Sequence, residues 1–474
     1  MTERLSGAFR LRPPGEAPRL SSYRALFGDS RVRRFALAGA LSYAAPAAIV
    51  LTLVWSIATA PEYSGHLSYA ALSLALLGLA ATVPTLLAAL VSGTLADRNE
   101  RRSLMRLTNA LALVGTLGIL ADLFVRPGMA ISLPGPSGYF VPAWMLLLFP
   151  AWAAISAATT MFRPAYNAAL PNLVPSSELA AVNGLVFALS IGVSIVGSLA
   201  ATGLLDLERS QLGVSALIPL ALLIGAQAEL TKILPDRTAR PAGPATTFLH
   251  DARRGYAYLG ARRELLQITV TALAINFLST VAFVELGLYV TDSLGISNAI
   301  LYGGMVTGSS LGVAIGSLLM GRFRFERVAG RMLALVTVGE GVSVLVLGLS
   351  RTIWISLPDM VLFGVFPGMY MTVFLATIQA TVPNELLGRV LAADEVGSYA
   401  MVPVGQYVGG LLTLALGSAQ TPFLIAGTGT ILIGLLMVSF RKLRQLGFEP
   451  GRGPAGASGH LPPPSPPVPG ETVL

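Results

Sequence analysis

The sequence predicts an all-α membrane protein of twelve transmembrane helices in two pseudo-symmetric six-helix bundles. The prediction rests on the scarcity of charge, on the length of the apolar runs and on the positions of the basic residues. Only 12% of the 474 residues are charged, whereas 54% are hydrophobic. A soluble domain carries about a quarter charged residues, roughly twice the share found here.

Twelve apolar runs are long enough to cross the hydrocarbon layer as helices, which takes about 20 residues. Stretches such as Ala71–Leu90 do not alternate between apolar and polar residues, so they are typical of helices and not of barrel strands. The runs lie near residues 33–57, 67–92, 105–124, 141–163, 179–203, 212–233, 264–290, 299–321, 330–350, 353–379, 389–416 and 420–441.

The 32 Lys and Arg residues are distributed unevenly between alternate loops. With the N-terminus placed inside, the cytoplasmic segments hold 29 of them, and the opposite loops hold Arg126, Arg209 and Arg351. Because this asymmetry follows the positive-inside rule, the net charge of +8 reflects topology and does not indicate a nucleic-acid partner. We expect a multi-pass membrane protein with both termini in the cytoplasm.

Polar segments divide the chain. We expect a cytoplasmic N-terminal segment at 1–32, a bundle at 33–233, a cytoplasmic central loop at 234–263, a second bundle at 264–441 and a disordered cytoplasmic tail at 442–474. The halves echo each other, since Ala169-Leu-Pro-Asn172 follows the fourth run and Thr381-Val-Pro-Asn384 follows the tenth. Such a repeat implies a pseudo-two-fold axis along the membrane normal, with a binding site between the halves.

The composition argues against several classes of function. The chain has no cysteine, and its three histidines fall in expected loops or tails, so we expect neither a metal site nor another cofactor. ATP-driven pumping would need a P-loop, and that pattern does not occur. An intramembrane enzyme would need a nucleophile and a base, or metal ligands, within the runs. Enzyme activity is therefore only a remote alternative.

The sharpest motif, Gly93-Thr-Leu-Ala-Asp-Arg-Asn-Glu-Arg-Arg102, follows the second run. Gly93 permits a close backbone turn, and Asp97 can cap a helix or pair with an arginine at the membrane edge. In this loop the sequence resembles the major facilitator superfamily, whose signature is Gly-x-Leu-Ala-Asp-Arg followed by basic residues. The matching residues are Gly93, Leu95, Asp97, Arg98, Arg101 and Arg102.

The segment Phe162–Pro171, through Leu179 and Asn183, resembles the branch that contains bacterial siderophore and macrolide efflux proteins. The pieces Gln379–Pro383 and Gly388–Val390 resemble the same branch, which implies a location in the bacterial inner (plasma) membrane. The resemblance covers roughly residues 30–445. In the equivalent loop of the second half, Phe325 stands where the signature has an acidic residue, so we carry no role over to that loop.

The resemblance implies a gating latch at the cytoplasmic side, formed by Gly93, Asp97, Arg98, Arg101, Arg102 and Arg163. For Arg163, on the fourth run, the alternative is an ordinary side chain that extends to the membrane interface.

Two rows of small residues recur every four positions, which permits close helix contact. The rows are Ser190, Ser194 and Ser198 on the fifth run, and Gly304, Gly308, Gly312 and Gly316 on the eighth. Because these runs face each other in the superfamily, the resemblance implies a seam between the halves that slides during transport. Static packing is the alternative.

Carboxylates inside apolar runs are costly, so they are functional candidates. Glu285 and Asp359 are candidates for proton coupling, because the resemblance places their runs beside a central cavity. The alternative is that both are hydrated residues of an outer vestibule. Glu340 also lies within a run, and the sequence assigns it no role.

The remaining polar and aromatic candidates would give an aromatic, lightly charged substrate cavity. They are Tyr43, Trp152, Thr159, Asn276, Phe283, Phe363, Phe366 and Tyr370. The sequence thus favours a monomeric secondary active transporter in the lipid bilayer that exports small amphipathic or hydrophobic molecules by alternating access. Its coupling ion would be a proton, with another ion as the alternative. An importer of a small metabolite is the competing function.

Overall fold

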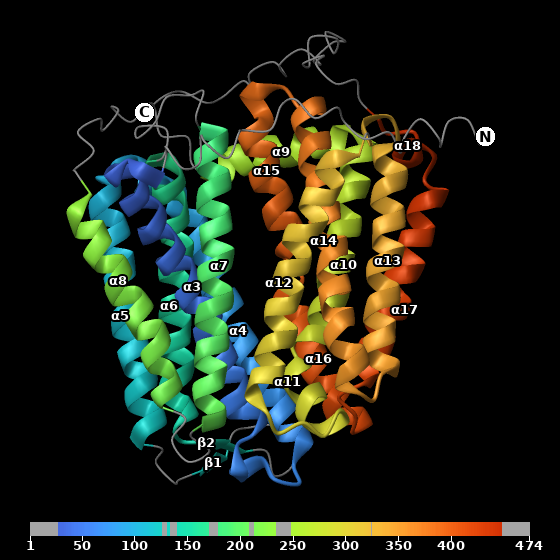
Figure 1. Ribbon diagram of the computed structural model, residues 1–474. Coiled ribbons are helices and arrows are strands. Elements are labelled where there is room, and N and C mark those ends of the chain that lie inside the picture. Colours follow the sequence, from blue (N-terminus) through green and yellow to red (C-terminus); the bar gives the residue numbers. More distant parts are fainter. Residues whose placement is uncertain are drawn as a thin grey trace, which may run out of the picture.

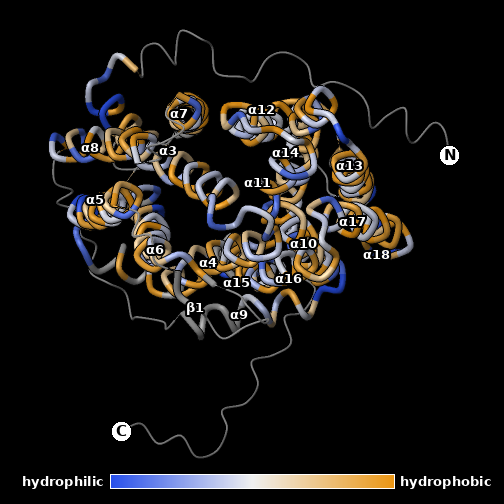
Figure 2. Tube along the Cα trace, turned by 90° about the horizontal axis from the view of Figure 1, so that it is seen from below, coloured by the Kyte–Doolittle hydropathy of each residue, from blue (hydrophilic) through white to orange (hydrophobic). Residues whose placement is uncertain are grey.

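The structure is a computed structural model that describes residues 27–125, 130–132, 140–169, 179–207, 213–233, 248–323 and 325–447. Within these ranges, twelve helices are long and apolar enough to cross a membrane. The expected fold class is therefore confirmed. Figure 1 shows the helices running nearly parallel in two groups, and Figure 2 shows hydrophobic residues predominating along them.

The N-terminal bundle has six membrane-length helices. They are α3 (Ser30–Ala58), α4 (Leu67–Arg98), α5 (Arg101–Val125), α6 (Met145–Ala169), α7 (Leu179–Leu207) and α8 (Leu217–Lys232). Short 3₁₀ turns, η1 (Pro61–Tyr63) and η3 (Val214–Ala216), connect some of them. The expected loop between α5 and α6 carries an antiparallel pair of strands, β1 (Ala130–Ser132) and β2 (Phe140–Pro142).

The C-terminal bundle contains the other spans. They are α10 (Arg263–Phe283), followed by α11 (Leu286–Leu288) and the π-turn η4 (Tyr289–Ser293); α12 (Ala299–Arg322); α13 (Ala329–Leu349), preceded by η5 (Glu326–Val328); α14 (Ile353–Thr381); α15 (Asn384–Tyr399) with α16 (Val402–Leu416); and α17 (Thr421–Ser439). The two ends of the molecule are distinct (Figure 1). We call the end with β1 and β2 the hairpin end, and the end with α9 (Phe248–Ala261) and α18 (Arg441–Arg444) the α9 end.

Two spans that we expected to be continuous, 264–290 and 389–416, are interrupted. In the eleventh span, α15 ends at Tyr399 and α16 begins at Val402. Pro403 explains this break, because proline has no backbone N–H to continue the helix of the preceding turn. In the seventh span, α10 ends at Phe283 and the chain turns tightly at Glu285, whose N–H donates to the carbonyl of Ala282 at 3.2 Å.

Helix ends elsewhere follow ordinary capping chemistry. Asp29 begins α3 by accepting a hydrogen bond from the Arg31 N–H at 2.8 Å, as an N-cap side chain does. Asn298 begins α12 in the same way, accepting from the Leu301 N–H at 3.2 Å. Gly417 ends α16 in the left-handed conformation, with φ of 63°.

Part of the expected central loop is the helix α9, which packs on α15. A side chain at Gly255 would collide with the backbone of Arg389, so glycine permits this close approach. The Tyr258 hydroxyl donates to the Thr381 carbonyl at 3.4 Å, and the Arg262 guanidinium lies 5.2 Å from the Tyr258 ring centre. Burial raises the pKa of the Tyr258 hydroxyl, and the Arg262 charge partly opposes this. The central loop is thus partly attached to the C-terminal bundle. The expected N-terminal segment up to residue 26 and the tail from residue 448 lie outside the described residues.

Three hydrophobic cores hold the bundles together. The largest lies toward the hairpin end and contains buried residues of both bundles, among them Ile49 and Leu74 from the first and Leu286 and Met305 from the second. Toward the α9 end, each bundle has a separate core, one around Phe35 and the other built entirely from C-terminal residues. The two bundles therefore share apolar packing at the hairpin end.

Candidate functional site: the closed end of the interface between the bundles

Helices α7 and α12 meet at the hairpin end through a charged cap. The Asp206 carboxylate, in the last turn of α7, accepts hydrogen bonds from the Ala299 N–H at 2.6 Å and the Ile300 N–H at 2.9 Å. These N–H groups belong to the first turn of α12, where the helix dipole also favours a negative charge. Beside them, Gly303 of α12 packs directly on Thr202 of α7. Figure 1 shows α7 and α12 diverging from this point toward the α9 end.

Aromatic and aliphatic contacts extend the closure to α3. Trp55 of α3 stacks on Tyr302 of α12, with ring centres 5.6 Å apart and planes inclined by 24°. Both side chains are buried. Gly287 of α11 lies against α3, since a Cβ there would be 2.7 Å from Val54 Cγ1 and 3.4 Å from Ala58 Cβ. The ends of α3, α11 and α12 are thus in direct contact.

A third contact joins α4 to α16. The Thr82 hydroxyl donates to the Gln406 side-chain carbonyl at 3.0 Å, and Gly78 makes room for the Gln406 side chain. Nearer the hairpin end, Gly410 packs against the backbone of Ala71 and the side chain of Ala75. Of these contacts, the Thr82–Gln406 hydrogen bond lies farthest from the hairpin end. Between this bond and the hairpin end, the interface is filled by apolar packing such as that of Gly410 against Ala71 and Ala75.

Glu285 lies within this closure at the break in the seventh span. Its side chain is 0% exposed, and neither carboxyl oxygen has a hydrogen-bond partner among the described residues. The neighbouring Ala282 and Leu286 belong to the core that both bundles share. Burying an unpaired carboxylate without hydrogen bonds costs several kcal/mol. The enclosure therefore accommodates the neutral, protonated carboxyl group much better than the ionised one.

Two other buried carboxyl groups of the C-terminal bundle accept hydrogen bonds from neighbouring helices. Asp359 of α14 is 7% exposed and accepts a hydrogen bond from the Ser343 hydroxyl of α13 at 3.0 Å. Glu340 of α13 is 5% exposed and accepts from the Ser279 hydroxyl of α10 at 3.2 Å. Both bonds join helices of one bundle, so these groups contribute to packing inside the C-terminal half. Asp359 stays a candidate for coupling, and Glu285 is a fully buried carboxyl group within the core that both bundles share.

We expected the glycine row on the eighth span, α12, to pack against the fifth span, α7, and this expectation is wrong. Side chains at Gly312 and Gly316 would collide with the backbone carbonyls of Val361 and Val365, and one at Gly308 would lie 3.2 Å from Val361 Cγ2. The row, which begins at Gly304, thus faces α14 of the same bundle and not α7. Spacing by four indicates a smooth helix face, but it carries no information about which helix packs there.

The matching row on α7 has a different environment. Ser198 is 2% exposed, and the Ser190 hydroxyl is buried without a hydrogen-bond partner in the described part of the chain, while Ser194 is half-buried. One turn after Ser198, Thr202 makes the contact with Gly303. The seam between α7 and α12 therefore lies at this end of the row, and whether it slides stays a prediction.

The expected latch residues lie at the α9 end. The side chains of Gly93, Asp97 and Arg98 fall outside the described residues. Arg102 donates hydrogen bonds to the carbonyls of Leu230 at 3.4 Å and Thr231 at 2.6 Å, which ties α5 to α8 within one bundle. Arg101 lies half-exposed at the start of α5, and Arg163 is exposed on α6. The latch stays a prediction.

Among the cavity candidates of the N-terminal bundle, two are packed. Tyr43 sits edge-on to Phe162 and Tyr166, with each pair of ring centres 5.7 Å apart. Trp152 is 6% exposed in the shared core. Thr159 is half-buried, and its hydroxyl donates to a carbonyl one turn earlier on its own helix.

In the C-terminal bundle, Phe283 and Phe363 are in ring contact, with centres 4.4 Å apart. The Asn276 amide donates to a backbone carbonyl of α15 at 2.9 Å. Phe366 packs against a glycine of α13, away from the N-terminal bundle. Tyr370 stacks on Phe374 of its own helix, with ring centres 6.3 Å apart. Of the eight residues predicted to line a substrate cavity, Phe283 and Phe363 are the pair that the structure places in contact with each other.

The closure also involves residues that the sequence did not single out. Asp206 lies just beyond the run expected at 179–203, and its role depends on a helix end more than ninety residues away in the chain. Gln406 is an uncharged polar residue inside an apolar run, which is a weak signal that could have drawn attention. Tyr302 was likewise not singled out, whereas Trp55 is an aromatic candidate on the first run. Nothing in the sequence indicates that these two rings stack on each other.

This arrangement combines a buried carboxyl group with non-covalent contacts between the bundles that can separate. No group of three or more His, Asp or Glu residues that could hold a metal ion occurs in the described ranges. Two linked six-helix bundles that meet at one end are the architecture of transporters of the major facilitator type.

Residues 41–451 match the family described as "Transmembrane secretion effector". The chain belongs to this family, within the efflux-type transporters of the major facilitator superfamily. Its relatives include the enterobactin exporter EntS of Shigella dysenteriae serotype 1 (strain Sd197), 25% identical over 366 residues that cover 75% of this chain and 81% of the relative. EntS of Escherichia coli O139:H28 is 26% identical over 368 residues, with the same coverage.

Solved structures show the same fold at low sequence identity. A xylose transporter, XylE of E. coli in an inward-open conformation, has a TM-score of 0.61 and 13% identity, covering 89% of this chain and 97% of that one. A POT family transporter has a TM-score of 0.63 and 12% identity, covering 89% and 96%. These likenesses bear on the fold alone.

Proposed function

We propose that this protein exports a small amphipathic molecule from the cytoplasm by alternating access, in exchange for protons. The observation that carries the proposal is the one-sided closure. The bundles share a core, a charged helix cap and a stacked aromatic pair at the hairpin end, whereas toward the α9 end each has a core of its own. Export requires that this closure open while the α9 end closes.

The orientation follows from the basic residues. The α9 end carries the arginines of α9, of the α12–α13 connection and of α18, and Arg351 lies at the hairpin end. Under the positive-inside rule, the α9 end faces the cytoplasm. The closure is then an outer gate, and the conformation is one that opens toward the cytoplasm.

Glu285 provides a physical link between protonation and the gate. In the closed gate its side chain is fully buried and has no hydrogen-bond partner within the described residues. An ionised Glu285 would destabilise the closed gate by several kcal/mol. A proton taken up from the outer side would therefore favour closure, and its release toward the cytoplasm would favour reopening. This is the sequence of events that an antiporter needs.

The substrate class follows from the relatives and from the chemistry of the interior. Both relatives described above are named enterobactin exporters. Phe283 and Phe363 offer aromatic surface, which suits an amphipathic aromatic molecule. We therefore infer a siderophore-like aromatic substrate and use enterobactin as the first probe.

The test uses inverted membrane vesicles that contain the protein, with an imposed pH gradient, acid inside. We expect accumulation of enterobactin that a protonophore abolishes, and no accumulation in vesicles without the protein. Accumulation in right-side-out vesicles only would identify an importer and contradict the proposal. Accumulation that follows a sodium gradient and ignores pH would contradict proton coupling.

A further inference from the structure

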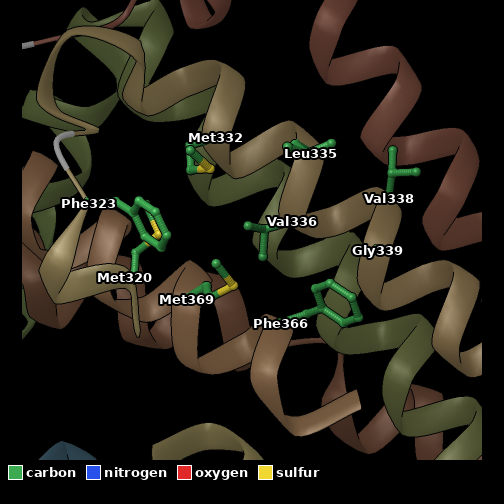
Figure 3. Close-up of a pocket in the computed structure, with 9 residues that line it drawn as sticks. All are labelled: Met320, Phe323, Met332, Leu335, Val336, Val338, Gly339, Phe366 and Met369. Atoms are coloured by element: carbon green, nitrogen blue, oxygen red, sulfur yellow. The ribbon is translucent and has the colours of Figure 1, made fainter. Parts of the chain in front are cut away.

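A wholly apolar cavity of about 320 Å³ lies in the C-terminal bundle, separate from the outer gate. Helices α12, α13 and α14 supply its wall, with no polar lining surface. Figure 3 shows Met320 and Phe323 on one side of the space, Phe366 on another and Met369 between them. The volume lies within the usual range of small-molecule sites, about 300–1,000 Å³, but the lining offers nothing that would orient a polar substrate.

The cavity opens toward the hydrocarbon of the membrane. Leu335, one of its lining residues, is 61% exposed on α13, and Val342 and Leu349 continue the same exposed apolar face of that helix. A membrane-spanning helix with such a face lies against lipid. Methionine and phenylalanine line most of the rest, and the flexible thioether side chains of methionine adapt to a variable apolar occupant.

Its depth fits one acyl chain. The lining runs along α13 from Met332, near the α9 end, to Gly339. Since α13 begins at Ala329, Gly339 lies about 15 Å along the helix at 1.5 Å per residue. The lining from Met332 to Gly339 itself covers about 10 Å of the helix, and its inner end reaches the middle of a hydrocarbon core about 30 Å thick. The cavity therefore matches a lipid tail that enters from the α9 end.

Positive charge surrounds this end of the cavity. Arg322, Arg327 and Arg331 are exposed in the α12–α13 connection, within a few residues of the lining Phe323 and Met332. Glu326 is the one acidic residue among them in the sequence. Guanidinium groups are well suited to bind phosphate. At the membrane surface the phosphates are those of lipid headgroups, and basic pockets of this kind bind anionic lipids.

We propose that this site binds an anionic phospholipid of the leaflet at the α9 end, with one acyl chain in the cavity and the phosphate at the three arginines. The lipid would brace α12 and α13 against α14, the helix on which the glycine row of α12 packs. The site is independent of the proposed export function.

Native mass spectrometry of the purified full chain tests the proposal, with dioleoyl phosphatidylglycerol and dioleoyl phosphatidylethanolamine as probes. We expect the wild type to retain phosphatidylglycerol at least 5-fold better than phosphatidylethanolamine. Combined Arg322→Gln, Arg327→Gln and Arg331→Gln should abolish this preference, whereas Arg31→Gln, Arg34→Gln and Arg106→Gln, the same loss of charge on the other bundle, should preserve it.

A second variant tests the tail. Val336→Phe places a ring in the cavity and should reduce retention of both lipids, with the melting temperature as a check on folding. Inorganic phosphate at millimolar concentration should not compete, because the tail supplies much of the affinity. Competition by phosphate would instead indicate an ion site. Unchanged phosphatidylglycerol preference in the triple arginine variant would overturn the proposal whether or not Val336→Phe folds.

Discussion

Replacing Asp206 by alanine should weaken the outer gate by a predictable amount. The substitution removes two charge-assisted hydrogen bonds, of 2.6 and 2.9 Å, that cross between the bundles. Such a bond contributes about 1.5–3 kcal/mol net, but Ile300 is 43% exposed, so water replaces part of the loss. We therefore take about 2 kcal/mol for the pair. This corresponds to a roughly 30-fold larger population of the open gate.

The absence of cysteine from the chain makes the assay clean. Thr202→Cys places a single thiol at a site that is 0% exposed and covered by Gly303 of the other bundle. When opening and closing are fast, its labelling rate by a membrane-impermeant maleimide follows the population of the open gate. Addition of Asp206→Ala should raise the rate about 30-fold. Asp292→Ala, which removes an exposed carboxylate at the same end, is the matched control and should leave it unchanged.

A labelling rate within twofold of the background in the Asp206→Ala protein would refute this reasoning. It would mean either that the cap does not hold the gate or that the gate opens without separating α7 from α12. Complete labelling of the same thiol after unfolding excludes an unreactive cysteine as the cause.

Three further predictions concern separate parts of the molecule. Glu285→Gln should abolish transport driven by a pH gradient in vesicles, while substrate binding persists. Transport by this variant that still depends on the pH gradient would eliminate Glu285 as the coupling site. Gly312→Ala should destabilise the protein by about 1–3 kcal/mol, because the new methyl group collides with the Val361 carbonyl. Gly304→Ala is the control and should leave the melting temperature unchanged, since the atom nearest to its methyl group would be 3.5 Å away. Equal melting temperatures for the two variants would show that the contact at Gly312 is loose. Asp97→Asn should reduce substrate flux at normal membrane insertion, and full flux in a well-expressed variant would remove the latch.

The sequence predicted the spans well because membrane insertion depends on a local property, the length of an apolar run. Ten predicted runs agree with the membrane-length helices within a few residues at most ends. The runs at 264–290 and 389–416 conceal the turn at Glu285 and the break after Tyr399. Beside that turn Gly287 packs against α3, a contact that no local pattern specifies. Positions within the membrane are thus predictable from sequence far more readily than breaks in a helix.

The candidate site was predicted only in part, for a related reason. Burial of Glu285 could be anticipated from its apolar neighbours, since a carboxylate in an apolar run is conspicuous. The partner of the Gly312 row could not, because a smooth helix face fits any neighbour. The role of Asp206 requires knowledge that α7 and α12 end side by side. Contacts between bundles are properties of the assembled fold.

The central claim is that the hairpin-end closure must open during transport, and a reversible cross-link across it tests this most directly. A Cβ at Gly287 would lie 3.4 Å from the Ala58 Cβ, close to the 3.5–4.5 Å that a disulfide requires. The double variant Ala58→Cys, Gly287→Cys should therefore form a disulfide between the bundles, with each single variant as a control. We predict that oxidation abolishes enterobactin transport in inverted vesicles and that reduction restores it. Undiminished transport by fully cross-linked protein would contradict alternating access through this gate.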